Sequence, residues 1–429
     1  MQRAHVLAAA FVAVASMACS ADRNEDAHAS SAEIVSGTDS SAAQDETVLL
    51  MRYQPSGVVV TIERCTGTLV APNLVLTARH CVSETDDNAA SCKANGVHED
   101  FAVSGLYVFV GSASPGDLSK AATYEKAAAK GKKIYTDGGT NLCGHDVALL
   151  ALDRSIPNAK IAPIRIDRGP AIGEAFTAVG WGMTENSNSG NSGTEPAVRK
   201  QRTGLTITGV GPAAASSSNP ELTAADFMTG ESICGGDSGG PALSDSTHAV
   251  IGVVSRGGNG TSAQPRGCIG ANTTNVYTQT APFRNLILQA FADVGETPWT
   301  ENGADPRKAA FGQACQVPTD CQSGLCYQGA CNLDCFSVAC PAGYACTLEG
   351  SQKFCKVPVT SVADAGTNSG AAPQDLEIAG GSCAASPRPA PFASGASALF
   401  AFALLARRRR RAPFTSFTPF TNRAESQSR

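Results

Sequence analysis

Aromatic side chains are scarce in this chain of 429 residues, and its basic side chains form no stripe. Phe, Trp and Tyr make up 6% of the sequence, against 43 glycines and 23 prolines. That composition suits β-rich domains with many turns and flexible linkers, and the length is too great for one ordinary domain. Five of the 33 basic residues stand together at 407–411, so the rest carries 28 basic and 38 acidic side chains, a net charge of −10. This acidic body argues against nucleic acid as a partner.

The sixteen cysteines favour disulfides and export to an oxidising compartment. The apolar stretch 6–18 is too short to span a bilayer comfortably, and it is typical of a secretory signal peptide ending at residue 18. Cys19 follows, in what resembles a bacterial lipoprotein cleavage site, although Ser16 stands where leucine is usual. Lipidation of Cys19 and ordinary cleavage both stay open. Residues 19–33 are polar and small, which predicts a propeptide.

A glycine-rich octapeptide at residues 234–241, Cys-Gly-Gly-Asp-Ser-Gly-Gly-Pro, has the pattern of a nucleophile on a turn. Glycines leave the hydroxyl of Ser238 clear of neighbouring side chains. They also leave the backbone N–H groups of Gly236 and Ser238 free to point at a substrate carbonyl oxygen. A nucleophile and an oxyanion hole are two needs of acyl transfer.

A base and a group to orient it occur upstream. His80 lies in Thr-Ala-Arg-His-Cys, and Asp146 begins Asp-Val-Ala-Leu-Leu. Among known triads, the order His, Asp, Ser belongs to the chymotrypsin-type β-barrels. With Ile-Val-Ser-Gly at 34–37 and Gly-Trp-Gly at 180–182, five blocks stand in one order. The chain from 34 to about 295 therefore resembles the trypsin/chymotrypsin family of serine proteases.

The resemblance implies an all-β fold of two six-stranded antiparallel β-barrels with a C-terminal helix. Many short β-rich runs separated by Gly, Pro and Asn agree with it, and residues 282–294 have helical periodicity. It also implies an endopeptidase of proteins or peptides that needs no cofactor. Two Gly-, Ser- and Asn-rich stretches, 184–195 and 211–220, are expected to be surface loops.

The family mechanism gives each matching residue a role. Ser238 would attack the scissile carbonyl, His80 would carry the proton, and Asp146 would orient the imidazole. Gly236 and Ser238 would form the oxyanion hole. Ser255 would support the aspartate at the edge of the substrate pocket.

Activation in the family creates a new N-terminus, here Ile34, whose ammonium pairs with the carboxylate before the nucleophile, here Asp237. The uncut chain would be a zymogen. Because Glu33 precedes Ile34, the activating protease is not expected to have trypsin specificity.

The substrate pocket implied by the resemblance has a neutral floor. Ser232 stands where trypsin-like members carry aspartate, and Gly257 and Asn275 align with the pocket walls. A buried substrate cation would lack a partner there. We therefore expect cleavage after uncharged side chains, while neighbouring Glu231 leaves basic residues open.

Six cysteines fall in the protease region. Family position implies the pairs Cys65–Cys81 and Cys234–Cys268. Cys92 and Cys143 have no family counterpart, and pairing with each other is the expectation that follows.

Residues 296–314 are expected to be a linker, and a cysteine-rich module follows at 315–356. Its eight cysteines are Cys315, Cys321, Cys326, Cys331, Cys335, Cys340, Cys346 and Cys355. So short a segment buries little apolar surface, which predicts four disulfides, of unknown connectivity. Zinc is the competing interpretation, although the module has no histidine and no Cys-x-x-Cys pair.

The C-terminal end has a stop-transfer pattern after a flexible stretch, 357–380. Residues 381–411 contain Cys383, an apolar segment and five arginines. They resemble the C-terminal sorting signals of myxobacterial surface proteins, the MYXO-CTERM type, in which the cysteine motif is processed. The polar tail 412–429 departs from that pattern, and a plain membrane anchor is the alternative.

Together these features predict an exported serine endopeptidase, anchored at a bacterial cell surface or outer membrane, or extracellular. A rival hypothesis is a catalytically inactive relative that acts as an adhesin, binding a cell-surface ligand through its cysteine-rich module. A third combines the two, with the module targeting an active protease.

Overall fold

The computed structural model describes residues 34, 37–56, 59–86, 92–183, 196–216, 219–258, 268 and 273–358. Several predictions lie outside these residues. They are the signal peptide, lipidation of Cys19, the propeptide, the loop at 184–195, processing of Cys383, and the sorting signal with its tail.

Six antiparallel strands close into a barrel in the N-terminal half of the protease region. They run in the order β2 (Thr47–Ser56), β3 (Val59–Ala71), β4 (Leu74–Thr77), β9 (Ala148–Leu152), β8 (Ala129–Tyr135) and β7 (Leu106–Phe109). Leu50 pairs with Val108 across β2 and β7, and both side chains are buried in the barrel core with Leu69, Val75 and Leu150. Strands β4 and β9 are buried on both faces, because Val75 and Leu150 belong to this core while Leu76 and Leu149 belong to a second buried cluster.

A second sheet contains eight strands. Its order is β1 (Thr38–Asp39), β11 (Lys200–Thr206), β10 (Ala175–Gly180), β14 (Pro241–Ser244), β15 (Val250–Gly258), β16 (Thr274–Gln279), β13 (Asp226–Thr229) and β12 (Gly209–Val210). Phe227 and Tyr277 stack with ring centroids 5.1 Å apart inside it. The predicted all-β class is confirmed. In the described residues this second unit is an eight-stranded sheet rather than a closed six-stranded barrel, because β1 and β12 extend its two ends.

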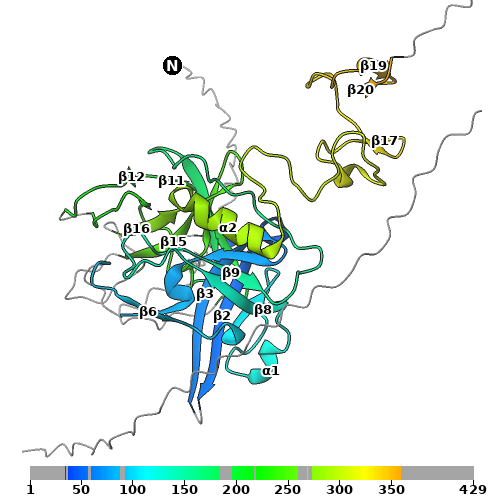
Figure 1. The fold of residues 1–429 in the computed structure, drawn as a ribbon. Coiled ribbons are helices and arrows are strands. Elements are labelled where there is room, and N and C mark those ends of the chain that lie inside the picture. Colours follow the sequence, from blue (N-terminus) through cyan, green and yellow to red (C-terminus); the bar gives the residue numbers. More distant parts are fainter. Residues whose placement is uncertain are drawn as a thin grey trace, which may run out of the picture. The chain divides into compact units, whose positions relative to one another are not determined.

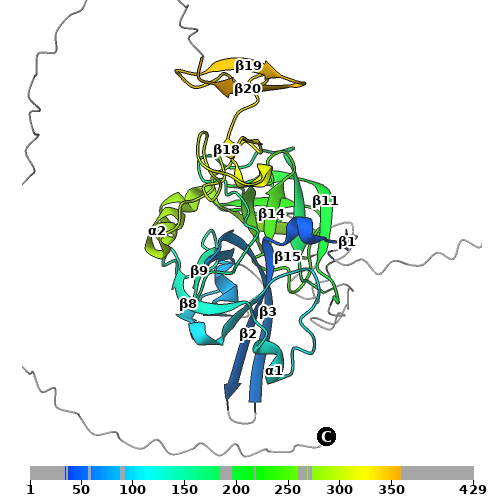
Figure 2. The same ribbon diagram turned by 90° about the vertical axis from the view of Figure 1, so that its right-hand side faces the viewer.

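The predicted C-terminal helix is present as α2 (Arg284–Val294). It packs against β4 and β9 and buries Ile287, Ala290 and Phe291. These side chains join a core that takes residues from both sheets. Figure 2 shows α2 on the same side of the protease region as β8 and β9. The helix ends at Gly295, whose φ of 75° is the left-handed conformation that glycine adopts readily. The two sheets and the helix thus share one apolar core.

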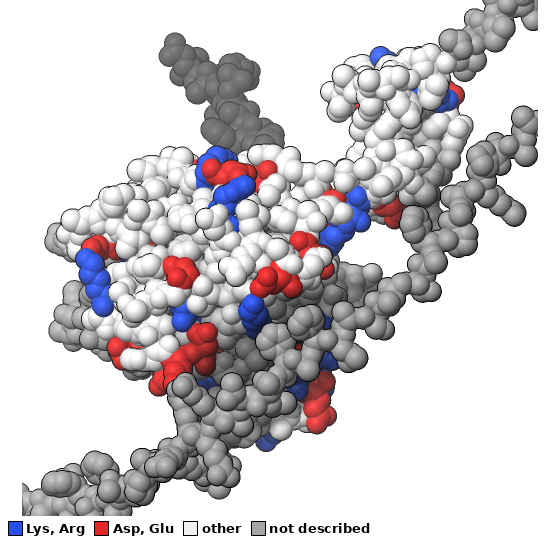
Figure 3. Space-filling view, in the orientation of Figure 1, with Lys and Arg blue, Asp and Glu red and all other residues white. Residues whose placement is uncertain are grey.

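Short elements complete the protease region. They are η1 (Ala42–Gln44), η2 (Arg79–Cys81), η3 (Val103–Gly105), η4 (Ala281–Phe283), α1 (Ala121–Tyr124) and the pair β5 (Ser83–Thr85) and β6 (Val97–Asp100). On the face drawn in Figure 3, acidic and basic side chains of the described residues are interspersed, without a basic stripe. No helix among the described residues is long and apolar enough to cross a membrane.

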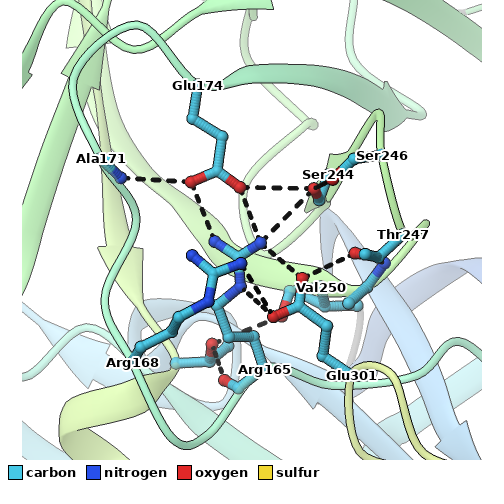
Figure 4. Close-up of polar contacts among 11 residues, drawn as sticks. Arg165, Arg168, Ala171, Glu174, Ser244, Ser246, Thr247, Val250 and Glu301 are labelled. Atoms are coloured by element: carbon cyan, nitrogen blue, oxygen red, sulfur yellow. Dashed lines mark hydrogen bonds and ion pairs between the residues drawn. The ribbon is translucent and has the colours of Figure 1, made fainter.

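The segment after Gly295, predicted to be a linker, bonds to the protease region. Ile164 donates its amide to Trp299 O at 2.8 Å, and Glu301 donates its amide to Ile164 O at 3.0 Å. The Trp299 side chain packs against the barrel core. The Glu301 carboxylate meets the guanidinium of Arg165, whose exposed fraction is 1% (Figure 4). This segment is held by backbone pairing and by a buried ion pair.

The cysteine-rich module has two disulfide-bonded halves, one with β17 and the other with β19 and β20 (Figure 1). The halves touch, because Tyr327 of the first stacks on Phe354 of the second with ring centroids 4.0 Å apart. Each half holds two interlaced disulfides, Cys315–Cys326 with Cys321–Cys331, and Cys335–Cys346 with Cys340–Cys355. The short strands are β17 (Cys326–Tyr327), β18 (Ala330–Cys331), β19 (Ala345–Glu349) and β20 (Gln352–Lys356), with η5 (Pro318–Asp320) before them. Because all eight sulfurs are in disulfides, the module has no thiolate left to bind zinc.

Candidate active site

Sheet register brings the predicted base and its orienting acid together. Thr77, the last residue of β4, pairs with Ala148, the first of β9. His80 follows Thr77 by one turn, in η2, and Asp146 precedes Ala148, so both reach the same edge of the barrel. The Cys65–Cys81 disulfide ties the turn that carries His80 to β3.

The carboxylate of Asp146 is fully buried and receives several hydrogen bonds. His80 Nδ1 lies 2.9 Å from Oδ2 and 3.0 Å from Oδ1, and the His80 amide donates to Oδ1 at 3.1 Å. Ser255 Oγ donates to Oδ2 at 2.6 Å. These bonds fix the ring so that Nδ1 faces the acid and Nε2 faces away from it.

Each member of the pair shifts the other's pKa. Burial by itself lowers the pKa of His80, but the charge of Asp146 and its hydrogen bond outweigh burial and raise it above 6.5. Burial favours a higher pKa for Asp146, yet the charge of His80 and the hydrogen bonds from His80 and Ser255 hold that pKa below its ordinary value. The carboxylate therefore stays ionised beside a basic imidazole.

The octapeptide turn is bonded to the barrel beside the histidine. Thr66, on β3, donates its amide to Ser238 O at 2.8 Å and its hydroxyl to Gly236 O at 2.9 Å. Cys81 Sγ lies 3.5 Å from Ser238 O. Gly236 has a φ of 100°, a conformation that favours glycine. The residue next to His80 thus contacts Ser238 directly.

The hydrogen bonds of this turn's amides bear on the predicted oxyanion hole. Asp237 and Gly240 use their N–H groups in hydrogen bonds to Cys234 O and Asp237 O. The amides of Gly236 and Ser238 donate no hydrogen bond to any residue in the part of the chain that the structure describes. They are available to a substrate oxygen.

The side chain of Asp237 is buried, with an exposed fraction of 1%. Its carboxylate accepts the amides of Gly182 at 2.6 Å and Cys234 at 2.9 Å. Burial raises its pKa to about 7, although the two backbone hydrogen bonds lower it. A Cβ on Gly180 or Gly182 would lie 2.2 Å from a carboxylate oxygen, which explains the Gly-Trp-Gly block. Ile34 is also fully buried.

The expected pocket residues come from two neighbouring strands, β15 and β16, and from the loop after β13. Ser232 Oγ lies 3.2 Å from Tyr277 Oη, and both are buried. Asn275 pairs in register with Gly257 and donates its Nδ2 to Gly230 O at 3.0 Å. A Cβ on Gly257 would lie 2.0 Å from Asn275 Oδ1. Asn275 therefore fills the space beside Gly257.

The protease cysteines form the pairs Cys65–Cys81, Cys92–Cys143 and Cys234–Cys268. The second pair joins Cys92, in the stretch between His80 and Asp146, to Cys143, three residues before Asp146. That stretch is therefore tied covalently to the segment that carries Asp146.

Sequence reasoning missed two residues next to this site, Arg256 and Asp226. Arg256 Nη2 lies 3.1 Å from Asp226 Oδ2, and Asp226 is fully buried. Arg256 directly follows Ser255, which is a signal that sequence offers. Asp226 is brought near only by the register of β13, β16 and β15.

An all-β fold with a His–Asp pair beside a serine on a glycine turn defines the class of serine-type hydrolases. The family model described as Trypsin matches residues 44–287, more than half of the chain. The chain is 28% identical over 240 residues to Trypsin 5G1 of Aedes aegypti, which covers 52% of this chain and 74% of the relative. It is also 28% identical over 238 residues to Snake venom serine protease 3 of Protobothrops flavoviridis, covering 55% and 80%. The chain belongs to the trypsin family and is a serine-type endopeptidase, with proteins or peptides as substrates.

Proposed function

We propose that His80, Asp146 and Ser238 form the catalytic triad of this endopeptidase. Ser238 attacks the scissile carbonyl, and His80 takes its proton and returns it to the leaving amine. Asp146 keeps the imidazole tautomer and stabilises the imidazolium. The amides of Gly236 and Ser238 bind the oxyanion, where the loss of one donor typically costs about 10²–10³ in kcat.

The observation that carries this proposal is the 2.9 Å contact between His80 Nδ1 and Asp146, on a turn whose next residue touches Ser238. A fluorophosphonate probe tests it, since the probe phosphonylates only an activated serine. The cut chain is expected to be labelled on Ser238 and the Ser238→Ala variant is not. A cut, folded chain that stays unlabelled would favour the inactive adhesin.

We infer further that the chain is a zymogen. Cleavage before Ile34 would free an ammonium for the buried carboxylate of Asp237, whose pKa is raised by burial despite the charge of Arg64. Ile34 has a φ of 34°, which is strained for a β-branched residue. Cutting the bond before Ile34 removes that constraint. Because Glu33 precedes the cut, the activator is a protease without trypsin specificity.

The proposed specificity is for uncharged side chains. Ser232 and Tyr277 offer hydroxyls at the pocket floor, and neither carries the charge that a lysine or arginine needs. The charge of Glu231 is offset by Arg202, at 3.5 Å. A panel of peptide p-nitroanilides tests this, and a strong preference for arginine would overturn it.

We also propose that the protease is exported and anchored at a bacterial surface. Seven disulfides support an oxidising compartment. The lipoprotein-like Cys19 would leave with the propeptide, so the C-terminal segment around Cys383 would be the lasting anchor. The cysteine-rich module would bind a cell-surface ligand. Mass spectrometry of the mature termini tests the cuts before Ile34 and at Cys383.

A further inference from the structure

The guanidinium of Arg256 lies between the candidate triad and a buried acid. Its Nη2 donates to Asp226 Oδ2 at 3.1 Å and to Glu221 O at 3.0 Å. Its Nη1 lies 3.4 Å from Ser255 Oγ, a long hydrogen bond. The rigid fork of arginine can make these contacts at once, whereas a single ammonium cannot.

The contacts continue to the histidine. Ser255 Oγ donates to Asp146 Oδ2 at 2.6 Å, and Asp146 Oδ2 lies 2.9 Å from His80 Nδ1. A hydroxyl that accepts a hydrogen bond from a cation becomes a stronger donor, because hydrogen bonds in a chain polarise one another. Arg256 therefore strengthens the hydrogen bond from Ser255 to Asp146. The Asp146 carboxylate then stabilises the imidazolium of His80 less.

We propose that Arg256 is a positioning residue, which acts on Asp146 through Ser255 and is itself held by Asp226. The inference rests on the proposed triad. Arg256 does not touch reacting atoms. Its effect is to keep the Ser255 hydroxyl turned toward Asp146 and to limit how basic His80 becomes.

The charges around the site set the direction of the effect. Asp146 and Glu63 both raise the pKa of His80. Two cations act on carboxylates of the site. Arg64 lowers the pKa of Asp237, and Arg256 is linked to Asp146 through the hydroxyl of Ser255. Removing Arg256 takes away the cation linked to the carboxylate of Asp146, so the pKa of His80 rises further. The acid limb, which is the part of the pH profile where the rate increases as His80 loses its proton, then moves to higher pH.

The test measures fluorophosphonate labelling rate against pH. The full chain is used, with an enteropeptidase site in place of residues 29–33, so that the cut exposes Ile34. Arg256→Met is expected to move the acid limb up by about 0.5 pH unit, which slows labelling about threefold at pH 6. In a Ser255→Ala background the same change is expected to add no further shift. An unmoved limb, or an equal shift without Ser255, would overturn the proposal.

Arg256→Met leaves Asp226 buried without its cation, which endangers folding. The double variant Asp226→Asn with Arg256→Met removes both charges, so the net charge near the site is unchanged, and it is expected to move the limb in the same direction by the part of the effect that Ser255 transmits. Arg284→Met, which loses an exposed ion pair with Asp167, is the matched control and should not move the limb. If the wild type is not labelled on Ser238, the proposed function fails. If the wild type is labelled but neither Arg256 variant moves the limb, only this inference fails.

Discussion

Glu301 binds Arg165 through both carboxylate oxygens. Arg165 Nε donates to Oε2 at 2.6 Å and Nη2 donates to Oε1 at 2.5 Å. Glu174 completes the arrangement, with Oε2 2.9 Å from Nη1 (Figure 4). The segment after the C-terminal helix thus supplies half of the charge that balances a buried arginine of the protease region. The stability of the protease region should depend on residues beyond the expected end of its domain.

Glu301→Gln is expected to lower the free energy of unfolding by about 2–3 kcal/mol, because hydrogen bonds to charged groups contribute about that much. Glu174 remains to balance Arg165, so folding should survive. Urea unfolding of the full chain measures the loss. Glu125→Gln, on an exposed side chain, should change stability by less than about 0.5 kcal/mol. A loss at Glu301 no larger than this control would contradict the assigned role.

The chain order of His80, Asp146 and Ser238 predicted the class of β-barrel fold. The helical periodicity of residues 282–294 predicted the helix that ends at Gly295. The Arg165–Glu301 pair could not be predicted, because 136 residues separate its members and only the pairing of Ile164 with Trp299 and Glu301 aligns them. Asp226 and Arg256 likewise depend on sheet register, which a single sequence specifies only weakly. The residues expected at the site come from motifs short enough to read along the chain, whereas their supporting residues come from tertiary packing.

The acid limb of activity should reflect the raised pKa of His80. Since the neutral imidazole is the base, labelling should increase with pH through a midpoint above 6.5. Asp146→Asn should slow labelling by about 10⁴-fold, because the imidazole loses its tautomer and its counter-charge. Asp137→Asn, which removes the partner of exposed His145, is the control and should leave rate and midpoint unchanged. A midpoint below 6.5 in the wild type would refute the assigned pairing.

Asp237 should give the uncut chain a characteristic pH dependence of stability. Its folded pKa of about 7 exceeds the ordinary 3.8, so the folded state binds more protons between these values. Stability should therefore fall as pH rises from about 4 to 7, by up to about 1.4 kcal/mol for each unit. Asp237→Asn should lack this slope. Thermal or urea unfolding of both uncut chains across the range measures the difference, and parallel curves would exclude a neutral buried Asp237.

The cut chain should lack this dependence of stability on pH. Once the Ile34 ammonium pairs with Asp237, the charged carboxylate is favoured and its pKa falls. The slope between about pH 4 and 7 should then disappear in the wild type. A slope that persists after verified cleavage would show that the ammonium does not reach Asp237.

Asn275 should limit the size of side chain that the pocket accepts. Its Oδ1 occupies the position that a Cβ on Gly257 would approach to 2.0 Å, and its Nδ2 is held by Gly230 O. Asn275→Gly removes this obstruction without adding charge. The ratio of kcat/KM for a phenylalanyl over an alanyl peptide p-nitroanilide should rise about tenfold, since pocket fit is worth about that much for one or two methylenes. Asn302→Gly, at a φ of 62° beyond the helix, is the matched control and should leave the ratio unchanged. A variant that is labelled normally but keeps the wild-type ratio would show that Asn275 does not bound the pocket.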